Sequence, residues 1–197
     1  MNRVPPGRYA LFWTLAIAGA VLDLGSKSLA FSLIGEPQDA LPGPSIAVWA
    51  GKLSLTTSYN RGALWGVGHR VPGANHIFAA LSVLAAVAFL VWLFWFGAAH
   101  SRSVTVALGF MMAGTVGNCY DRVILHQVRD FVFVEWINWP IFNLADSFLV
   151  CGAMILIWQA LFVELKPSGQ PGETAPAVQP VAEATSPAGF SSVGETS

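Results

Sequence analysis

Charged residues are scarce in this sequence. Lysine, arginine, aspartate and glutamate make up only 11% of the 197 residues, whereas 54% are hydrophobic and the mean hydropathy is +0.58. Soluble globular proteins usually carry about 25% charged residues, so this composition indicates an integral membrane protein. The formal net charge of -1 gives no electrostatic basis for binding nucleic acid.

The motifs of several enzyme classes are also missing. The two cysteines, Cys119 and Cys151, have no metal-ligand spacing around them, so we interpret them as packing residues. The sequence has no GxSxG elbow, P-loop or GxGxxG motif. The histidines are scattered and form no zinc motif such as HExxH: His69, His76, His100 and His126. We therefore expect no metal.

Four apolar stretches are long enough to cross a bilayer core of about 30 Å at about 1.5 Å per residue. They cover roughly residues 9–31, 76–96, 104–123 and 141–163. The first carries Asp23 and Lys27 and is too long for a cleaved signal peptide, so we expect it to be a permanent span. The segment SIAVWAGKLSLTTSYN is rich in β-branched and aromatic residues, which predicts a small sheet between the first two spans.

The chain divides into two predicted regions. Residues 1–166 form the helical membrane domain, with the small sheet within about residues 36–70. Residues 167–197 are rich in Pro, Ala, Gly, Ser, Thr and Glu and contain no lysine or arginine, which predicts a disordered tail. The positive-inside rule favours cytoplasmic termini, because five basic residues flank the spans on that side: Arg3, Arg8, His100, Arg102 and Lys166. The opposite side also holds basic residues, Lys52, Arg61 and Arg70, so the charge difference is small.

Alternating spans bring the unusual polar side chains to one membrane face, whichever way the protein is inserted. Ionisable groups at membrane depth cost at least about 2.5–3.5 kcal/mol each and commonly mark functional sites. The unusual polar residues are Asp23, Lys27, Asn118, Asp121, Arg122, Asp130 and Asp146, and all of them except Asn118 are ionisable.

Structural roles remain open for each of these residues taken alone. Asp23 and Lys27 are four residues apart, so on a helix they can neutralise each other. Asp121 and Arg122 can act as an interfacial pair that pins the third helix. A lone aspartate near the membrane surface, such as Asp130, is more often structural than catalytic.

Taken together, Asp130 and Asp146 form a candidate carboxylate pair. Two close carboxylates share one proton, so that one accepts a proton from water while the other polarises a carbonyl. This is the chemistry of aspartic peptidases. Asn118 and Asn143 are candidates to orient the pair by hydrogen bonds, and Arg122 to bias its charge. The alternatives are a small membrane transporter or proton-relay protein, which would use buried charges as a relay, and an inactive scaffold.

Several motifs occur in an order that resembles the bacterial lipoprotein signal peptidase family, also called signal peptidase II. They are DLGSK at 23–27, YNRGALWG at 59–66, GNCYDR at 117–122, VRDF at 128–131 and FNLADS at 142–147. Each motif alone is weak, but their order around the predicted spans is a specific signal. Arg61 and Leu64 differ from the residues common in the family, and the tail is outside the resemblance.

The resemblance implies an intramembrane aspartic endopeptidase of the bacterial inner membrane. Its fold would be all-α, with four transmembrane helices and a small periplasmic β-cradle between the first two. It would act without a cofactor, as a monomer among membrane lipids, on diacylated prolipoproteins, cutting just before the lipid-modified cysteine. Both termini would be cytoplasmic and the active site would face the periplasm.

The resemblance also assigns roles to residues. Asp130 and Asp146 would be catalytic. Supporting or substrate-binding positions would be Asp23, Lys27, Asn60, Gly62, Asn118, Asp121, Arg122 and Asn143.

Overall fold

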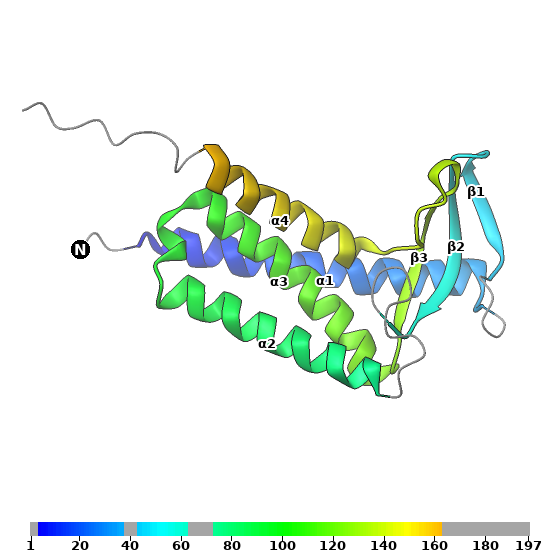
Figure 1. The fold of residues 1–197 in the computed structure, drawn as a ribbon, viewed down its shortest axis with the longest axis horizontal. Coiled ribbons are helices and arrows are strands. Elements are labelled where there is room, and N and C mark those ends of the chain that lie inside the picture. The colour runs from blue at the N-terminus through cyan, green and yellow to red at the C-terminus, as the bar shows by residue number, and fades with distance from the viewer. Residues whose placement is uncertain (1–3, 38–42, 63–72, 163–197) are drawn as a thin grey trace, which may run out of the picture. The chain divides into compact units, whose positions relative to one another are not determined.

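The computed structural model describes residues 4–37, 43–62 and 73–162. The long helices are α1 (Pro6–Ile34), α2 (Ala74–Phe94), α3 (Arg102–Ile124) and α4 (Leu144–Phe162). The strands are β1 (Ser45–Trp49), β2 (Leu53–Asn60) and β3 (Val128–Val134), and short 3₁₀ turns cover Ala98–His100 and Glu135–Ile137 (Figure 1). The predicted tail and residues 38–42 and 63–70 of the predicted cradle lie outside the described residues.

The helix ends follow local sequence signals. α1 begins with Pro6, whose fixed φ suits the first turn and whose missing N–H would have no partner there. It ends at Gly35, which has φ of 100°, a conformation that glycine adopts without strain. α3 begins after Ser101, whose side chain accepts a hydrogen bond from the Val104 N–H.

In the described part of the chain, three helices are long and apolar enough to cross a membrane: α1, α2 and α4. They correspond to the first, second and fourth predicted stretches, and many of their apolar side chains are exposed, including Leu22, Leu84 and Trp158. α3 coincides with the third stretch but is less apolar. Its buried face includes glycine, threonine, asparagine and aspartate, which pack against protein.

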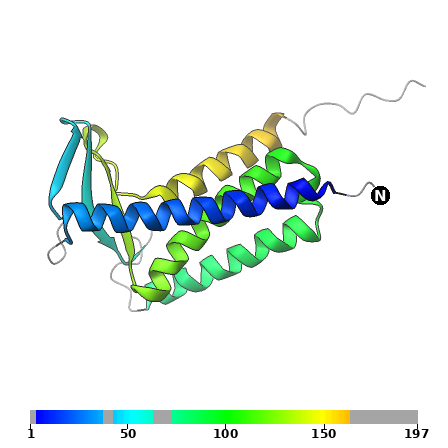
Figure 2. The same ribbon diagram turned by 180° about the vertical axis from the view of Figure 1, so that it is seen from behind.

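α3 lies at the centre of the helices and packs against each of the other three (Figures 1 and 2). α2 and α4 lie on opposite sides of it in both views. Close approach depends on small residues. A Cβ at Gly114 would collide with the Ala145 carbonyl oxygen of α4, and one at Gly117 would collide with the Asp23 carboxylate of α1. The contact face of α3 is therefore specified by side-chain size as well as by apolarity.

A small antiparallel sheet lies at the end of the helices where α1 finishes (Figure 2). Its order is β1-β2-β3, so the predicted small sheet is present as a β1–β2 hairpin and is joined by a strand from the α3–α4 connection. Phe31 of α1, Tyr59 of β2 and Phe131 of β3 belong to one apolar cluster that attaches the sheet to the helix. The sheet thus places β3 beside the ends of α1, α3 and α4.

Candidate active site

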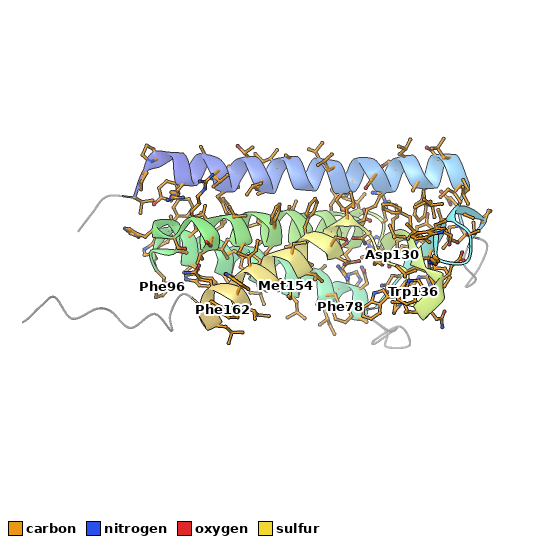
Figure 3. All side chains as sticks on the ribbon, turned by 90° about the horizontal axis from the view of Figure 1, so that it is seen from above. Phe78, Phe96, Asp130, Trp136, Met154 and Phe162 are labelled. Carbon is orange, nitrogen blue, oxygen red and sulfur yellow. The ribbon has the colours of Figure 1, made fainter. Side chains whose placement is uncertain are left out.

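Asp130 lies on β3, at the sheet end of the helices (Figure 3). It pairs with Ser58 of β2 and is 3% exposed. After β3 and its 3₁₀ turn, the chain returns alongside the strand, and Phe142 exchanges backbone hydrogen bonds with Val132. This return brings the following residue, Asn143, to the Asp130 side chain.

Asp146 lies in the first turn of α4 and is held by a reciprocal cap. The Asp146 N–H donates to Asn143 Oδ1 at 3.0 Å, and the Asn143 N–H donates to Asp146 Oδ2 at 3.2 Å. This is the capping-box arrangement, with asparagine as the N-cap and aspartate three residues later. The cap fixes the orientation of the Asp146 carboxylate, which remains partly exposed.

Asn143 joins the two aspartates. It is fully buried, and its Nδ2 donates to Asp130 Oδ1 at 2.6 Å. The same amide nitrogen lies 3.2 Å from Asn118 Oδ1. Because one side chain both caps α4 at Asp146 and bonds to Asp130, the two carboxylates are held in a defined relation although they come from different elements.

A second amide orients the other side of Asp146. Asn118 Nδ2 donates to Asp146 Oδ1 at 2.8 Å, and Asn118 Oδ1 accepts from Lys27 Nζ at 3.0 Å. Since ammonium is only a donor, Lys27 determines which end of the Asn118 amide faces the carboxylate. The asparagine is therefore oriented to stabilise charge on Asp146.

Buried charges behind these amides are compensated. Lys27 Nζ lies 2.8 Å from Asp23 Oδ2 and 3.4 Å from Asp121 Oδ2, and all three side chains are fully buried. The other Asp23 oxygen accepts from the Ala145 N–H at 2.8 Å, so α1 helps to cap α4. The predicted pairing of Asp23 with Lys27 is present.

Asp121 has different partners from those considered from the sequence. Instead of forming an interfacial pair with Arg122, it binds Lys27 and Arg129, whose Nη2 lies 2.8 Å from Asp121 Oδ1. Arg122 points elsewhere: it donates to the Asn118 and Gly62 carbonyl oxygens at 3.4 Å each. Adjacent residues on a helix do not face each other, which explains the difference.

β2 supplies another donor to Asp130. Asn60 Nδ2 donates to Asp130 Oδ2 at 3.2 Å, and Asn60 Oδ1 accepts from the Gly62 N–H at 2.9 Å. Gly62 is buried, so the end of β2 is held close to the carboxylate. The residues after Gly62 in the YNRGALWG motif lie outside the described residues.

The environment of Asp130 favours its protonated form. Burial, with the nearby negative charge of Asp146, raises the pKa of the Asp130 carboxyl to about 8. Hydrogen bonds from Asn143 and Asn60 oppose this rise because they stabilise the ionised form. At neutral pH Asp130 therefore retains a proton that it can donate.

The structure brings all ten predicted site residues into one connected region, although their roles remain predictions. Sequence reasoning did not single out Arg129 and predicted no strand at residues 128–134, between the third and fourth spans. The alternation of apolar and aromatic residues in VRDFVFV was the available signal for a strand. Within the described residues, no three His, Cys, Asp or Glu side chains form a group that could hold a metal ion.

Comparison with known proteins gives consistent matches over most of the chain. Residues 15–162 match the family described as signal peptidase (SPase) II. The lipoprotein signal peptidase of Rhodopirellula baltica is 40% identical over 195 residues, which cover 87% of this chain and 83% of the relative. That of Cellvibrio japonicus is 33% identical over 163 residues, covering 81% and 91% respectively.

A solved structure described as a bacterial membrane enzyme has the same fold, with a TM-score of 0.67 at 26% identity. The match covers 80% of this chain and 91% of the other. The apolar helices agree with a bacterial membrane protein. Since the family match extends over most of the chain and includes the whole region around Asp130 and Asp146, this membrane protein belongs to the signal peptidase II family.

Proposed function

We propose that this chain is an intramembrane aspartic endopeptidase that removes the signal peptide from diacylglyceryl-modified prolipoproteins, cutting just before the lipid-modified cysteine. The main support is the single buried side chain, Asn143, that bonds to both Asp130 and Asp146. The relatives are named lipoprotein signal peptidases, which supports a prolipoprotein substrate.

In the first step the pair, with one shared proton, activates water. Asp146 accepts a proton from the water as the water oxygen attacks the scissile carbonyl carbon. Asp130 donates its proton to the carbonyl oxygen, which gives a neutral tetrahedral diol. The raised pKa of Asp130 and the partial exposure of Asp146 support this division of roles.

In the second step the diol collapses. Asp146 gives its proton to the leaving nitrogen, the carbon–nitrogen bond breaks, and Asp130 recovers a proton as the carbonyl forms again. The pair ends in its starting state without a cofactor. Asn118, Asn143 and Asn60 support the reaction by holding the carboxylates. Asp23, Lys27, Asp121, Arg122 and Gly62 hold those amides and the surrounding backbone.

We also assign α3 as a fourth span. Its 23 residues give a length of about 35 Å, enough for a bilayer core, and it runs beside three membrane-capable helices. Its polar residues Thr105, Thr115, Asn118 and Asp121 are buried within the protein, and the exposed Arg102 and Ser103 lie in its first turn, so its lower apolarity does not expose polar groups in mid-span to lipid. With four spans, both termini lie on the cytoplasmic side and the sheet lies on the periplasmic side.

The location of Asp130 and Asp146 at the sheet end of the helices suits a signal-peptide substrate. A signal peptide inserts with its amino end in the cytoplasm, so its cleavage site emerges at the outer interface. The acyl chains of the substrate would enter sideways from the bilayer, and the scissile peptide bond would then lie at the depth of Asp130 and Asp146. The catalytic unit is a monomer, since both aspartates come from one chain.

The test uses purified protein in detergent with a diacylated prolipoprotein. Asp130→Asn and Asp146→Asn are each expected to abolish cleavage while the protein still inserts and unfolds cooperatively. Glu36→Gln is the matched control, because Glu36 is an exposed carboxylate just after the end of α1, at the same end of the helices as the aspartate pair. Substantial cleavage by either aspartate variant would contradict the mechanism, and equal cutting of unlipidated substrate would contradict lateral lipid entry.

A further inference from the structure

Arg129, next to Asp130 on β3, binds two helices at once. Its guanidinium reaches both oxygens of Asp121, through Nη2 at 2.8 Å and Nε at 3.3 Å. Its Nη1 donates to Ser28 Oγ of α1 at 3.1 Å. The arginine side chain is only 13% exposed and Asp121 is fully buried, so the two bonds to Asp121 lie largely out of water, whereas the bond to Ser28 is exposed. Two parallel bonds to one carboxylate fix direction as well as distance.

The backbone of Arg129 is held on both sides. Its N–H donates to Asp121 Oδ2 at 3.1 Å, and its carbonyl oxygen accepts from Asn143 Nδ2 at 3.4 Å. That carbonyl belongs to the peptide group that leads into Asp130. The position of the Asp130 backbone is therefore set from α3 through Asp121 and from the start of α4 through Asn143.

Arg129 also completes a charge balance. Lys27 and Arg129 are positive, and Asp23 and Asp121 are negative, so this group of four side chains is neutral. Because Arg129 compensates Asp121, Lys27 remains close to Asp23 and to Asn118 Oδ1. Loss of the guanidinium would leave Asp121 with Lys27 as its cationic partner and draw Lys27 away from Asn118.

We propose that Arg129 is a positioning residue for peptide-bond cleavage: through Asp121 it holds the start of β3 on α3 and thereby sets Asp130 relative to Asp146. This inference rests on the proposed function of the aspartate pair. Arg129 itself contacts neither reacting carboxylate with its guanidinium, so its effect is on the rate of the chemical step.

Arginine is required at this position for a geometric reason. Lysine carries the same charge but has a single ammonium, which lacks the planar fork that meets both oxygens of a carboxylate. Arg129→Lys should keep the charge balance and lose the second bond to Asp121 and the bond to Ser28. The lysine variant therefore separates charge from geometry and provides a second test if Arg129→Gln does not fold.

The experiment measures kcat, KM and thermal unfolding for Arg129→Gln and Arg129→Lys with a diacylated prolipoprotein. Misplacing a reacting group by about 1 Å costs about 100-fold in rate, so Arg129→Gln is expected to lower kcat about 10- to 100-fold. KM should stay within about twofold, because substrate binding is untouched. Arg129→Lys should recover part of the loss, to within about tenfold of the unaltered protein.

Two controls make the result specific. Arg102→Gln removes an exposed arginine at the opposite end of α3 and should leave kcat unchanged. The double variant Asp121→Asn/Arg129→Gln should lose no more activity than the more damaging single variant, because the two residues act through one contact.

A kcat within twofold of the unaltered protein in folded Arg129→Gln would overturn the inference, as would a loss confined to KM. Additive losses in the double variant would also overturn it. Failure of the proposed function is a separate outcome. It would appear as cleavage by Asp130→Asn, and this result does not depend on the kcat of the Arg129 variants.

Discussion

Replacing Asn143 with alanine tests the side chain that joins the aspartate pair. The substitution removes the amide that donates to Asp130 Oδ1 at 2.6 Å and the oxygen that accepts from the Asp146 N–H at 3.0 Å. The Asn143 backbone N–H still reaches Asp146, so that helix start loses only part of its cap. We expect both the stability and the pH dependence of cleavage to change.

The size of each effect follows from these bonds. Loss of an N-cap side chain costs about 1 kcal/mol. A hydrogen bond contributes about 1 kcal/mol when the partner is neutral and about 1.5–3 kcal/mol when it is charged. Because Asp130 is protonated at neutral pH, the free energy of unfolding should fall there by about 2 kcal/mol. The Asn143 amide stabilises ionised Asp130, so its removal raises the pKa of Asp130 further, by about one unit for about 1.4 kcal/mol.

The sign of the pH effect is determined by the active form of the pair. Cleavage needs one proton on the pair, and in the unaltered protein the rate should fall as pH rises past the Asp130 pKa of about 8. In Asn143→Ala that fall should occur at higher pH, by about one unit. The maximum rate should drop about 10- to 100-fold, because the carboxylates lose their common support.

The assay is initial cleavage rate from about pH 5.5 to 10 in detergent, together with thermal unfolding. Ser101→Ala is the matched control, since it removes the N-cap side chain of α3 at the end of that helix far from Asn118 and the aspartate pair. It should lower stability by about 1 kcal/mol and leave the pH profile unchanged. The fall in rate at high pH is the basic limb of the pH profile. If this limb stays in place, or moves to lower pH, in Asn143→Ala, this account of Asp130 is refuted.

Two further substitutions test close packing and the second donor. Gly117→Ala should lower stability by about 1–3 kcal/mol and reduce cleavage, because its Cβ would displace the Asp23 carboxylate; Gly25→Ala, whose Cβ meets nothing within 4 Å, should do neither. Asn60→Ala should move the basic limb to higher pH by less than Asn143→Ala does, since it removes one longer bond of 3.2 Å to Asp130. A larger shift in Asn60→Ala than in Asn143→Ala would contradict the conclusion that Asn143 is the stronger donor to Asp130.

Much of the fold could be predicted because it depends on local patterns. Long apolar runs identified the positions of α1, α2, α3 and α4, and β-branched and aromatic residues identified the β1–β2 hairpin. β3 was missed because VRDFVFV is short and sits between helices, where a connection was expected. Its strand conformation depends on pairing with β2, which is distant in the sequence.

The candidate site was predicted as a set of residues but not as a set of contacts. Span parity placed Asp130 and Asp146 at the same membrane face, and the structure brings them to one asparagine. Asp121 was considered with its neighbour Arg122, whereas its partners are Lys27 on α1 and Arg129 on the strand that follows. Adjacency in sequence was misleading because successive helix residues point in different directions.

The sequence by itself determined that this chain belongs in a membrane and that the aspartates in and between its spans share one membrane face, because hydropathy and helix length are local properties. Only the tertiary structure decided which groups share hydrogen bonds and ion pairs. Lys27 and Asn118 are 91 residues apart, yet their bond orients the amide that faces Asp146. The raised pKa of Asp130 likewise arises from burial under several elements, and no single segment contains that information.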